Sequence, residues 1–192
     1  QAPEMTVREY IEYMESDHTR DDGFNETLAI FQNGVSKTHP ELTNDFDSFP
    51  QVLKDLKAAG IGFQSGGVGA GEQFYLGQRN SGTQPHVHNH AWNMMAFGRK
   101  RWYLWTPDDA FYTTMPMRPY IDQVLSTLPP GKQPLTCVQE GGDFVYVANG
   151  WGHSVLNLED SVGIAVGLRG AFTIPFTAGK SSSYGSDRCP GH

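Results

Sequence analysis

The second half of the chain is a succession of short segments in which apolar and polar residues alternate. Aromatic and β-branched residues are concentrated in these segments, as is typical of strands with one buried face. Glycine, proline, asparagine and aspartate separate them and supply the turns. We predict strands over residues 73–79, 84–90, 101–106, 135–140, 143–148, 153–158 and 161–168, with tight hairpin turns at Gly141-Gly142 and Glu159-Asp160.

The first sixty residues carry a different pattern, with apolar residues three or four positions apart. Within residues 5–16, Thr6 is a candidate N-cap and Glu9 follows it at the spacing of a capping box, which predicts a short helix. A second helix is expected within residues 45–59. Between the two helices, the apolar run 27–32 is interpreted as an edge strand.

Together these elements predict a mainly β fold, a small β-barrel or jelly roll with short N-terminal helices and one inserted helix at 118–128. A chain of 192 residues can bury a core without metal or disulfide staples. We assign residues 1–62 to an N-terminal helical and edge-strand part of the same domain. Residues 63–170 form the barrel, and the Ser/Gly/Pro-rich residues 171–192 form a tail.

Composition argues against several classes of protein. The net charge is −7, and the longest basic run is Gly98-Arg99-Lys100-Arg101, so there is no basic face for nucleic acid. No apolar run reaches membrane-spanning length, and no signal peptide is recognisable. The glycine-rich residues 66–71 lack the Lys-Ser/Thr ending of a phosphate-binding loop and are interpreted as a turn or close-packed backbone.

The two cysteines, Cys137 and Cys189, allow one bridge at most and are equally compatible with free thiols. Asn25-Glu26-Thr27 is a glycosylation sequon, which matters only in a secretory protein. Neither feature decides the compartment.

Histidines supply the candidate chemistry. His86, His88 and His90 alternate with other residues, a period that places all three side chains on one face of a strand. His153 lies far downstream, at the start of another predicted strand. Neutral imidazole is the commonest protein ligand for metals, so His86, His88 and His153 predict a metal site with three open positions, an arrangement used by non-haem iron oxygenases. His90 is interpreted as a rim residue or as a partner of a ligand.

Several short motifs occur in one order over residues 60–170 and resemble the JmjC (Jumonji C) domain family. They are Gly82-Thr83-x-x-His86-x-His88, Ala91-Trp92-Asn93, Gly98-Arg99-Lys100-Arg101-Trp102, Gly142-Asp143-Phe144-Val145-Tyr146, Gly150-Trp151-Gly152-His153 and Leu156-Asn157-Leu158. The resemblance implies a double-stranded β-helix, a cupin-like barrel that binds Fe(II) and 2-oxoglutarate. It also implies a dioxygenase that hydroxylates or demethylates its substrate while decarboxylating 2-oxoglutarate.

Carried over residue by residue, the resemblance makes His86, His88 and His153 the metal ligands. Lys100 would pair with the distal carboxylate of 2-oxoglutarate, and Thr83 and Asn93 would contact the same cosubstrate. The nearest branch of the family is lumenal, so the resemblance implies the endoplasmic reticulum. The expected partner is a protein or peptide substrate, and the acidic chain argues against histone tails as the main target.

Three positions depart from the family pattern. His88 stands where active members carry Asp or Glu, so the metal keeps more positive charge, and Zn(II) or Ni(II) would also suit the site. Ala29 lies where a tyrosine would contact 2-oxoglutarate, and Gly152 replaces a tryptophan and is expected to thin the pocket wall. The main hypothesis is a protein hydroxylase. The alternatives are a catalytically impaired JmjC protein acting as a binding or structural module, and a cupin-like metal enzyme that does not use 2-oxoglutarate.

The remaining candidate groups are given structural roles. The aromatic side chains are interpreted as core and barrel wall rather than as a substrate cage: Trp92, Trp102, Tyr103 and Trp105. The acidic side chains fall in predicted turns and are interpreted as solvated rather than as a fourth ligand: Asp108, Asp109, Glu140 and Asp143.

Overall fold

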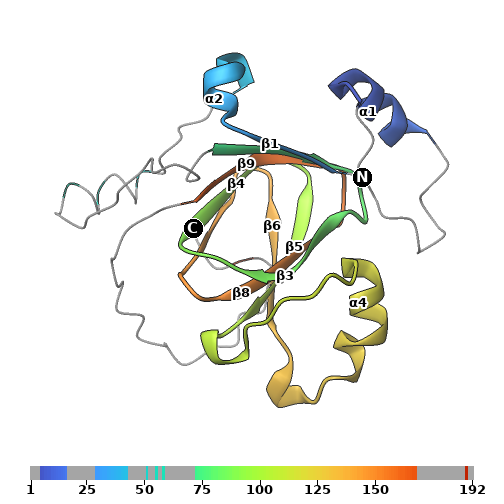
Figure 1. Cartoon of the computed structure of the whole chain (residues 1–192), viewed down its shortest axis with the longest axis vertical. Helices are drawn as coiled ribbons and strands as arrows, with labels where there is room; N and C mark the ends of the chain where they lie inside the picture. The colour runs from blue at the N-terminus through green and yellow to red at the C-terminus, as the bar shows by residue number, and fades with distance from the viewer. Residues whose placement is uncertain are drawn as a thin grey trace.

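The computed structural model shows two antiparallel sheets facing each other across a shared interior (Figure 1). It describes residues 5–16, 29–42, 51, 55, 58, 72–167 and 189. A five-stranded sheet has the order β1-β2-β9-β4-β7, and a four-stranded sheet has the order β3-β8-β5-β6. The strands are β1 (Ala29–Asn33), β2 (Glu72–Gly77), β3 (Gly82–Val87), β4 (Ala91–Phe97), β5 (Arg99–Trp105), β6 (Leu135–Glu140), β7 (Phe144–Val147), β8 (Gly152–Asn157) and β9 (Ser161–Gly167).

From β2 onward the chain alternates between the two sheets, except that β5 and β6 pair directly. This winding is the double-stranded β-helix, a jelly roll, and it confirms the predicted mainly β barrel. The turns at Gly141-Gly142 and Glu159-Asp160 exist, but the hairpins predicted there are wrong, because β6 and β7, and likewise β8 and β9, lie in different sheets. Each turn carries the chain across the barrel instead of back along it.

The helices follow their local signals. Thr6 caps α1 (Val7–Glu15): its hydroxyl accepts from the Glu9 amide, and the Glu9 carboxylate accepts from the Thr6 amide, as the capping box predicts. Of the second predicted helix, Gln51, Asp55 and Ala58 are helical, and the rest of 45–59 lies outside the described residues. The glycine-rich residues 66–71 and the Asn25 sequon also lie outside them. Within the described part, no helix is long and apolar enough to cross a membrane.

Two short elements and one strand were not predicted. The turn at Gly34 leads into α2 (Val35–Thr38) and a 3-10 turn, η1 (Pro40–Leu42), and Gly34 itself has a left-handed φ of 68° that favours glycine. The missed strand is β4, which pairs with both β7 and β9 and so is an interior strand of its sheet. Its sequence contains Ala and Met residues and no β-branched residue, so local propensity did not indicate a strand.

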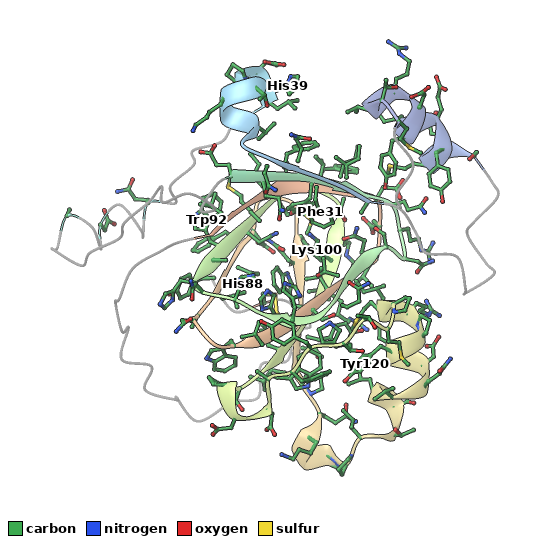
Figure 2. All side chains as sticks on the ribbon, viewed as in Figure 1. Phe31, His39, His88, Trp92, Lys100 and Tyr120 are labelled. Atoms are coloured by element: carbon green, nitrogen blue, oxygen red, sulfur yellow. A yellow bond between two sulfur atoms is a disulfide. The ribbon has the colours of Figure 1, made fainter. Side chains whose placement is uncertain are left out.

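The predicted inserted helix is present as α4 (Met117–Gln123), followed by a 3-10 turn, η3 (Leu125–Thr127). It packs against the four-stranded sheet on the side away from the barrel interior (Figures 1 and 2). Tyr103 and Trp105 on β5 and Leu156 on β8 form a buried cluster with Met117 and Tyr120 of the helix. The insertion therefore covers this sheet and leaves the interior free for polar groups.

Cys137 and Cys189 are joined by a disulfide. Cys137 lies on β6 in a buried cluster with Trp102 and Val155, and Cys189 packs on that cluster. The Cys189 amide also donates to the Val138 carbonyl. The bridge thus fastens a residue near the end of the chain to the edge strand β6.

Replacing both cysteines by serine should lower the free energy of unfolding. The bridge closes a loop across a sequence separation of 52, and loop-closure entropy assigns it about 4 kcal/mol. Chemical denaturation of the double variant measures this loss, and wild-type protein in reducing buffer should match the variant. Equal stability of oxidised wild type and variant would contradict a structural role for the bridge.

Candidate metal centre and its cavity

Three histidines converge at one end of the barrel interior. His86 is near the end of β3, His153 is near the start of β8, and the two are direct cross-strand partners. β3 ends at Val87, so His88 lies just beyond the strand, but its side chain still converges with that of His86 as predicted; His90 is the histidine that does not. A register shift in β3 between Thr83 and His86 accompanies this geometry. One ring nitrogen from each histidine lies within 4.8 Å of the others.

Backbone carbonyls fix the tautomer of every ring in this cluster. Each Nδ1 lies within hydrogen-bond distance of a carbonyl oxygen: 2.7 Å for His86 to Gln84, 2.6 Å for His88 to Asn89 and 3.1 Å for His153 to Trp151. A carbonyl oxygen can only accept, so each Nδ1 carries the proton. In the neutral rings, the Nε2 atoms therefore offer their lone pairs, as metal-ligating histidines do.

The free lone pairs face one another. His88 Nε2 and His153 Nε2 are 2.9 Å apart, a distance at which two lone pairs repel unless a proton or a metal ion lies between them. Burial, together with the neighbouring His86 and His88, lowers the pKa of His153 to about 3. Burial also lowers the pKa of His86. Protonation is thus disfavoured, and the residues present fit a divalent metal ion.

A cavity of about 90 Å³ extends from the histidines into the barrel. One buried water needs about 10–15 Å³ of such volume, so the cavity has room for about six to nine water-sized groups. Its polar lining away from the histidines includes Thr83, Asn93 and Lys100. The three residues that the sequence assigned to a cosubstrate thus line the same cavity as the three predicted ligands.

Lys100 is the charged group of this cavity. Its side chain is 4% exposed, and Figure 2 shows it between the two sheets, far from the solvent-exposed His39. Burial lowers the pKa of the Lys100 ammonium to about 7. Among the described residues no carboxylate pairs with it, and Nζ lies over the ring of Tyr75, 3.6 Å from the ring centroid. A buried ammonium in this setting favours an anionic ligand.

Asn93 and Trp102 are held by a hydrogen-bonded network behind the cavity wall. Gln139, which is fully buried, accepts from Trp102 Nε1 at 2.9 Å and donates to the Asn93 carbonyl at 3.0 Å. The Trp102 ring lies 6.2 Å from the His153 ring, centroid to centroid. Trp92, Trp102, Tyr103 and Trp105 are all buried, which agrees with a core and wall role.

Other predicted positions lie outside the cluster. His90 is buried beside Tyr146: its Nδ1 lies 2.6 Å from the Tyr146 hydroxyl and accepts from the Asn149 amide at 3.1 Å. Gly152 does not thin the pocket, and that expectation is wrong, because a side chain there would meet Ala110 and Trp105 instead of the cavity. Ala29 does not line the cavity either.

The acidic candidates stay out of the metal cluster. Asp109 pairs with Lys132, Glu140 pairs with Arg99, and the Asp143 carboxylate accepts from the Glu140 amide. Asp108 is exposed. No acidic residue of the described ranges joins the three histidines as a fourth ligand.

Several residues that line the cavity were not predicted, and two of them are aromatic. Tyr75 and Phe31 line the cavity from β2 and β1, where they are cross-strand partners. Both stand in strands whose aromatic residues are equally typical of an ordinary core. The position of Tyr75 against Lys100 emerges only from the pairing of strands that are far apart in sequence.

Comparison with known proteins gives a consistent family. The sequence model described as "JmjC domain, hydroxylase" matches residues 73–168, half of the chain. Human JmjC domain-containing protein 8 is 25% identical over 167 residues, covering 86% of this chain and 59% of its own length. The zebrafish 2-oxoglutarate and iron-dependent oxygenase JMJD4 is 31% identical over 105 residues, covering 47% of this chain and 24% of its own.

Among solved structures, Escherichia coli YcfD, a ribosomal oxygenase in complex with cobalt and succinic acid, aligns with a TM-score of 0.47 and 18% identity. The alignment covers 82% of this chain and 36% of that one. The chain spans 59% of the length of the JmjC domain-containing protein 8 relatives that it matches. The family match over residues 73–168 shows that the chain belongs to the JmjC domain family.

Proposed function

We propose that this chain binds Fe(II) through His86, His88 and His153 and 2-oxoglutarate through Lys100, Thr83 and Asn93, and that it hydroxylates a protein side chain. The observation that carries the proposal is the shared cavity. Three Nε2 lone pairs converge at one end, and a buried ammonium without a carboxylate partner among the described residues lies further in. A metal ion and a small dianion satisfy both features at once.

In this proposal the histidines bind the metal, and a second set of polar side chains binds 2-oxoglutarate. Neutral imidazoles hold the metal, and their Nδ1–carbonyl hydrogen bonds keep the rings oriented. The Lys100 ammonium supplies a charge-assisted bond to a carboxylate, and the Thr83 hydroxyl and Asn93 amide can donate to the same ligand. Fe(II) with 2-oxoglutarate, when bound, supplies the O2-dependent oxidation of a C–H bond that residues of the protein cannot perform alone.

The substrate and the compartment are part of the proposal. The net charge of −7 makes nucleic acid an unsuitable partner and leaves a protein or peptide substrate. The Cys137–Cys189 disulfide supports an oxidising compartment, because such bridges are rare in the cytosol. We therefore propose the lumen of the endoplasmic reticulum.

Glycosylation of the Asn25 sequon would test this compartment. Glycosidase treatment of protein expressed in cells should then increase its electrophoretic mobility, and Asn25→Gln protein should not respond to the enzyme.

One observation favours a second function. His88 stands in the cluster as a third neutral imidazole, so the described site contains no carboxylate to offset the metal charge. If a site without a carboxylate ligand does not support turnover, the chain acts as a binding module that the metal stabilises. Succinate release from 2-oxoglutarate, dependent on Fe(II) and O2, separates the two functions: wild-type release supports the hydroxylase, and its absence supports the module.

His88→Asp should shift metal preference toward harder ions. A carboxylate oxygen adds negative charge and suits Fe(II) and Mn(II), whereas imidazole suits Zn(II) and Ni(II). We expect the ratio of Fe(II) to Zn(II) affinity to rise by about 10-fold, the lower end of the effects known for groups that tune metal sites. Competition titrations measure the ratio. An unchanged ratio of the two affinities would show that His88 is not a ligand. If the variant releases succinate and the wild type does not, the third imidazole is what prevents turnover.

A further inference from the structure

Tyr75 contacts two of the polar side chains that line the cavity, Lys100 and Asn93. Its side chain comes from β2 and is 3% exposed. Its ring centroid lies 3.6 Å from Lys100 Nζ, and its hydroxyl donates to Asn93 Oδ1 at 2.9 Å, with the Met94 carbonyl 3.2 Å away. One residue thus links Lys100 to the side-chain amide of Asn93.

The fold makes room for this side chain. Gly163 on β9 is the cross-strand partner of Tyr75, and a Cβ on Gly163 would lie 2.2 Å from the Tyr75 hydroxyl. Any side chain at position 163 would therefore collide with the phenol as it crosses β9 to reach Asn93 on β4. A Cβ there would also collide with the Met94 carbonyl, so glycine at position 163 lets both the Tyr75 phenol and the backbone of β4 approach β9 closely.

We propose that Tyr75 is a positioning residue of the 2-oxoglutarate pocket, whose ring holds the Lys100 ammonium and whose hydroxyl orients the Asn93 amide for one dicarboxylate. The inference rests on the proposed function. Because the Asn93 oxygen accepts from Tyr75, the amide NH2 group is left to donate to a ligand. Because an aromatic face attracts a cation, the ring favours the ammonium form of the buried Lys100.

The electrostatics around Lys100 single out this ring. Burial raises the pKa of the Tyr75 phenol, so the ring is neutral and acts through its face, not through a phenolate charge. The other titratable groups that line the cavity are the three histidines. The neighbours that face Lys100 from β3, β4, β6 and β8 are uncharged: Thr83, Asn93, Gln139 and Asn157. Tyr75 is thus the described group that opposes the effect of burial on Lys100.

The test compares Tyr75→Phe with Tyr75→Leu. The protein is loaded with saturating Ni(II), which keeps the histidines ligated and prevents turnover, and 2-oxoglutarate is titrated calorimetrically from pH 6 to 9. In wild type the affinity should be constant below about pH 7 and fall about tenfold per pH unit above it, because binding then takes up a proton at Lys100.

The two variants should separate the ring from the hydroxyl. Phenylalanine keeps the ring, so affinity should fall about tenfold with the pH break unmoved. Leucine loses both groups, so affinity should fall about 100-fold and the break should move down by about one pH unit. Tyr13→Leu, on helix α1, is the matched control and should bind as wild type. The inference would be overturned if both variants bound 2-oxoglutarate as tightly as wild type. It would also be overturned if both lost the same affinity and the pH at which affinity begins to fall did not move, because Tyr75 would then only pack the core.

A ligand-free measurement distinguishes this inference from the proposed function. The pH dependence of Lys100 acetylation, followed by mass spectrometry, reports the charge state of its amine without any cosubstrate. A lower midpoint in Tyr75→Leu, and not in Tyr75→Phe, supports the role of the ring even if Ni(II)-loaded wild type fails to bind 2-oxoglutarate. That failure would sink the proposed function alone, whereas equal midpoints in all three proteins would sink the role of the ring.

Discussion

Replacing His86 by alanine is expected to weaken Fe(II) and Ni(II) binding by at least about 100-fold. Even partners that only orient a ligand are worth about 10- to 100-fold in metal affinity, and His86 supplies one of three ligand nitrogens. Isothermal titration measures the loss directly. Thermal unfolding gives a second readout, because metal at about 100 times its dissociation constant stabilises the wild-type fold by about 2.7 kcal/mol, and this gain should vanish in the variant.

His39→Ala is the matched control for this experiment. His39 is an exposed histidine beside Glu41, and Figure 2 shows it on the far side of the five-stranded sheet from the barrel interior. Its removal should leave metal affinity and the metal-dependent stabilisation unchanged. If His86→Ala keeps wild-type affinity while His39→Ala loses it, the ion binds elsewhere, and the converging nitrogens are not the metal centre.

Replacing Lys100 by methionine should lower 2-oxoglutarate affinity by about 100-fold while metal affinity stays the same. The change removes the ammonium and keeps the length and apolar bulk of the side chain. A hydrogen bond to a charged partner is worth about 1.5–3 kcal/mol, which corresponds to about 10- to 150-fold in binding. Titration of the Ni(II)-loaded variant with 2-oxoglutarate measures the difference.

Stability provides a second, opposite readout for this variant. Lys100 is 4% exposed and has no carboxylate partner among the described residues, so its charge costs folding free energy. Lys100→Met should therefore unfold at the same or higher denaturant concentration than wild type. Arg99 is the exposed neighbouring residue on β5, and Arg99→Met should leave both the 2-oxoglutarate affinity and the metal affinity unchanged. Unchanged 2-oxoglutarate affinity in Lys100→Met would remove this lysine from the pocket.

The barrel and its principal ligands were predictable because their signals are local. Alternation of apolar and polar residues indicated most strands, and the capping box at Thr6 and Glu9 located α1. The His-x-His spacing and the distant His153 indicate a metal site independently of any resemblance. Lys100, Thr83 and Asn93 came from resemblance alone, since a lysine at a strand end carries no signal of burial by itself.

The errors arose where tertiary packing overrides local sequence. β4 has no β-branched residue, yet it is held as a strand by neighbours on both sides. A tight turn has the same residues whether the next strand pairs with the last or crosses to the facing sheet, so the Gly141-Gly142 crossing could not be distinguished from a hairpin. β3 ends at Val87, so the predicted alternation over 84–90 stops there, and His90 packs beside Tyr146 instead of joining the cluster.

The remaining gaps concern pairs of residues that are remote in sequence. The bridge between Cys137 and Cys189 depends on where the end of the chain meets β6, which two cysteines cannot indicate. Tyr75 looked like any aromatic core residue until the fold set it against Lys100 and opposite Gly163. Such relations become visible only once the strand register is known.

The central claim is that one cavity holds a metal and 2-oxoglutarate together. Calorimetric titration of 2-oxoglutarate into the chain under anaerobic conditions, with and without Fe(II), tests it most directly. We predict saturable binding of about one equivalent that requires the metal and is weakened by about 100-fold in His86→Ala and in Lys100→Met. Absence of binding with Fe(II) present, or equal binding without metal, would contradict the shared site.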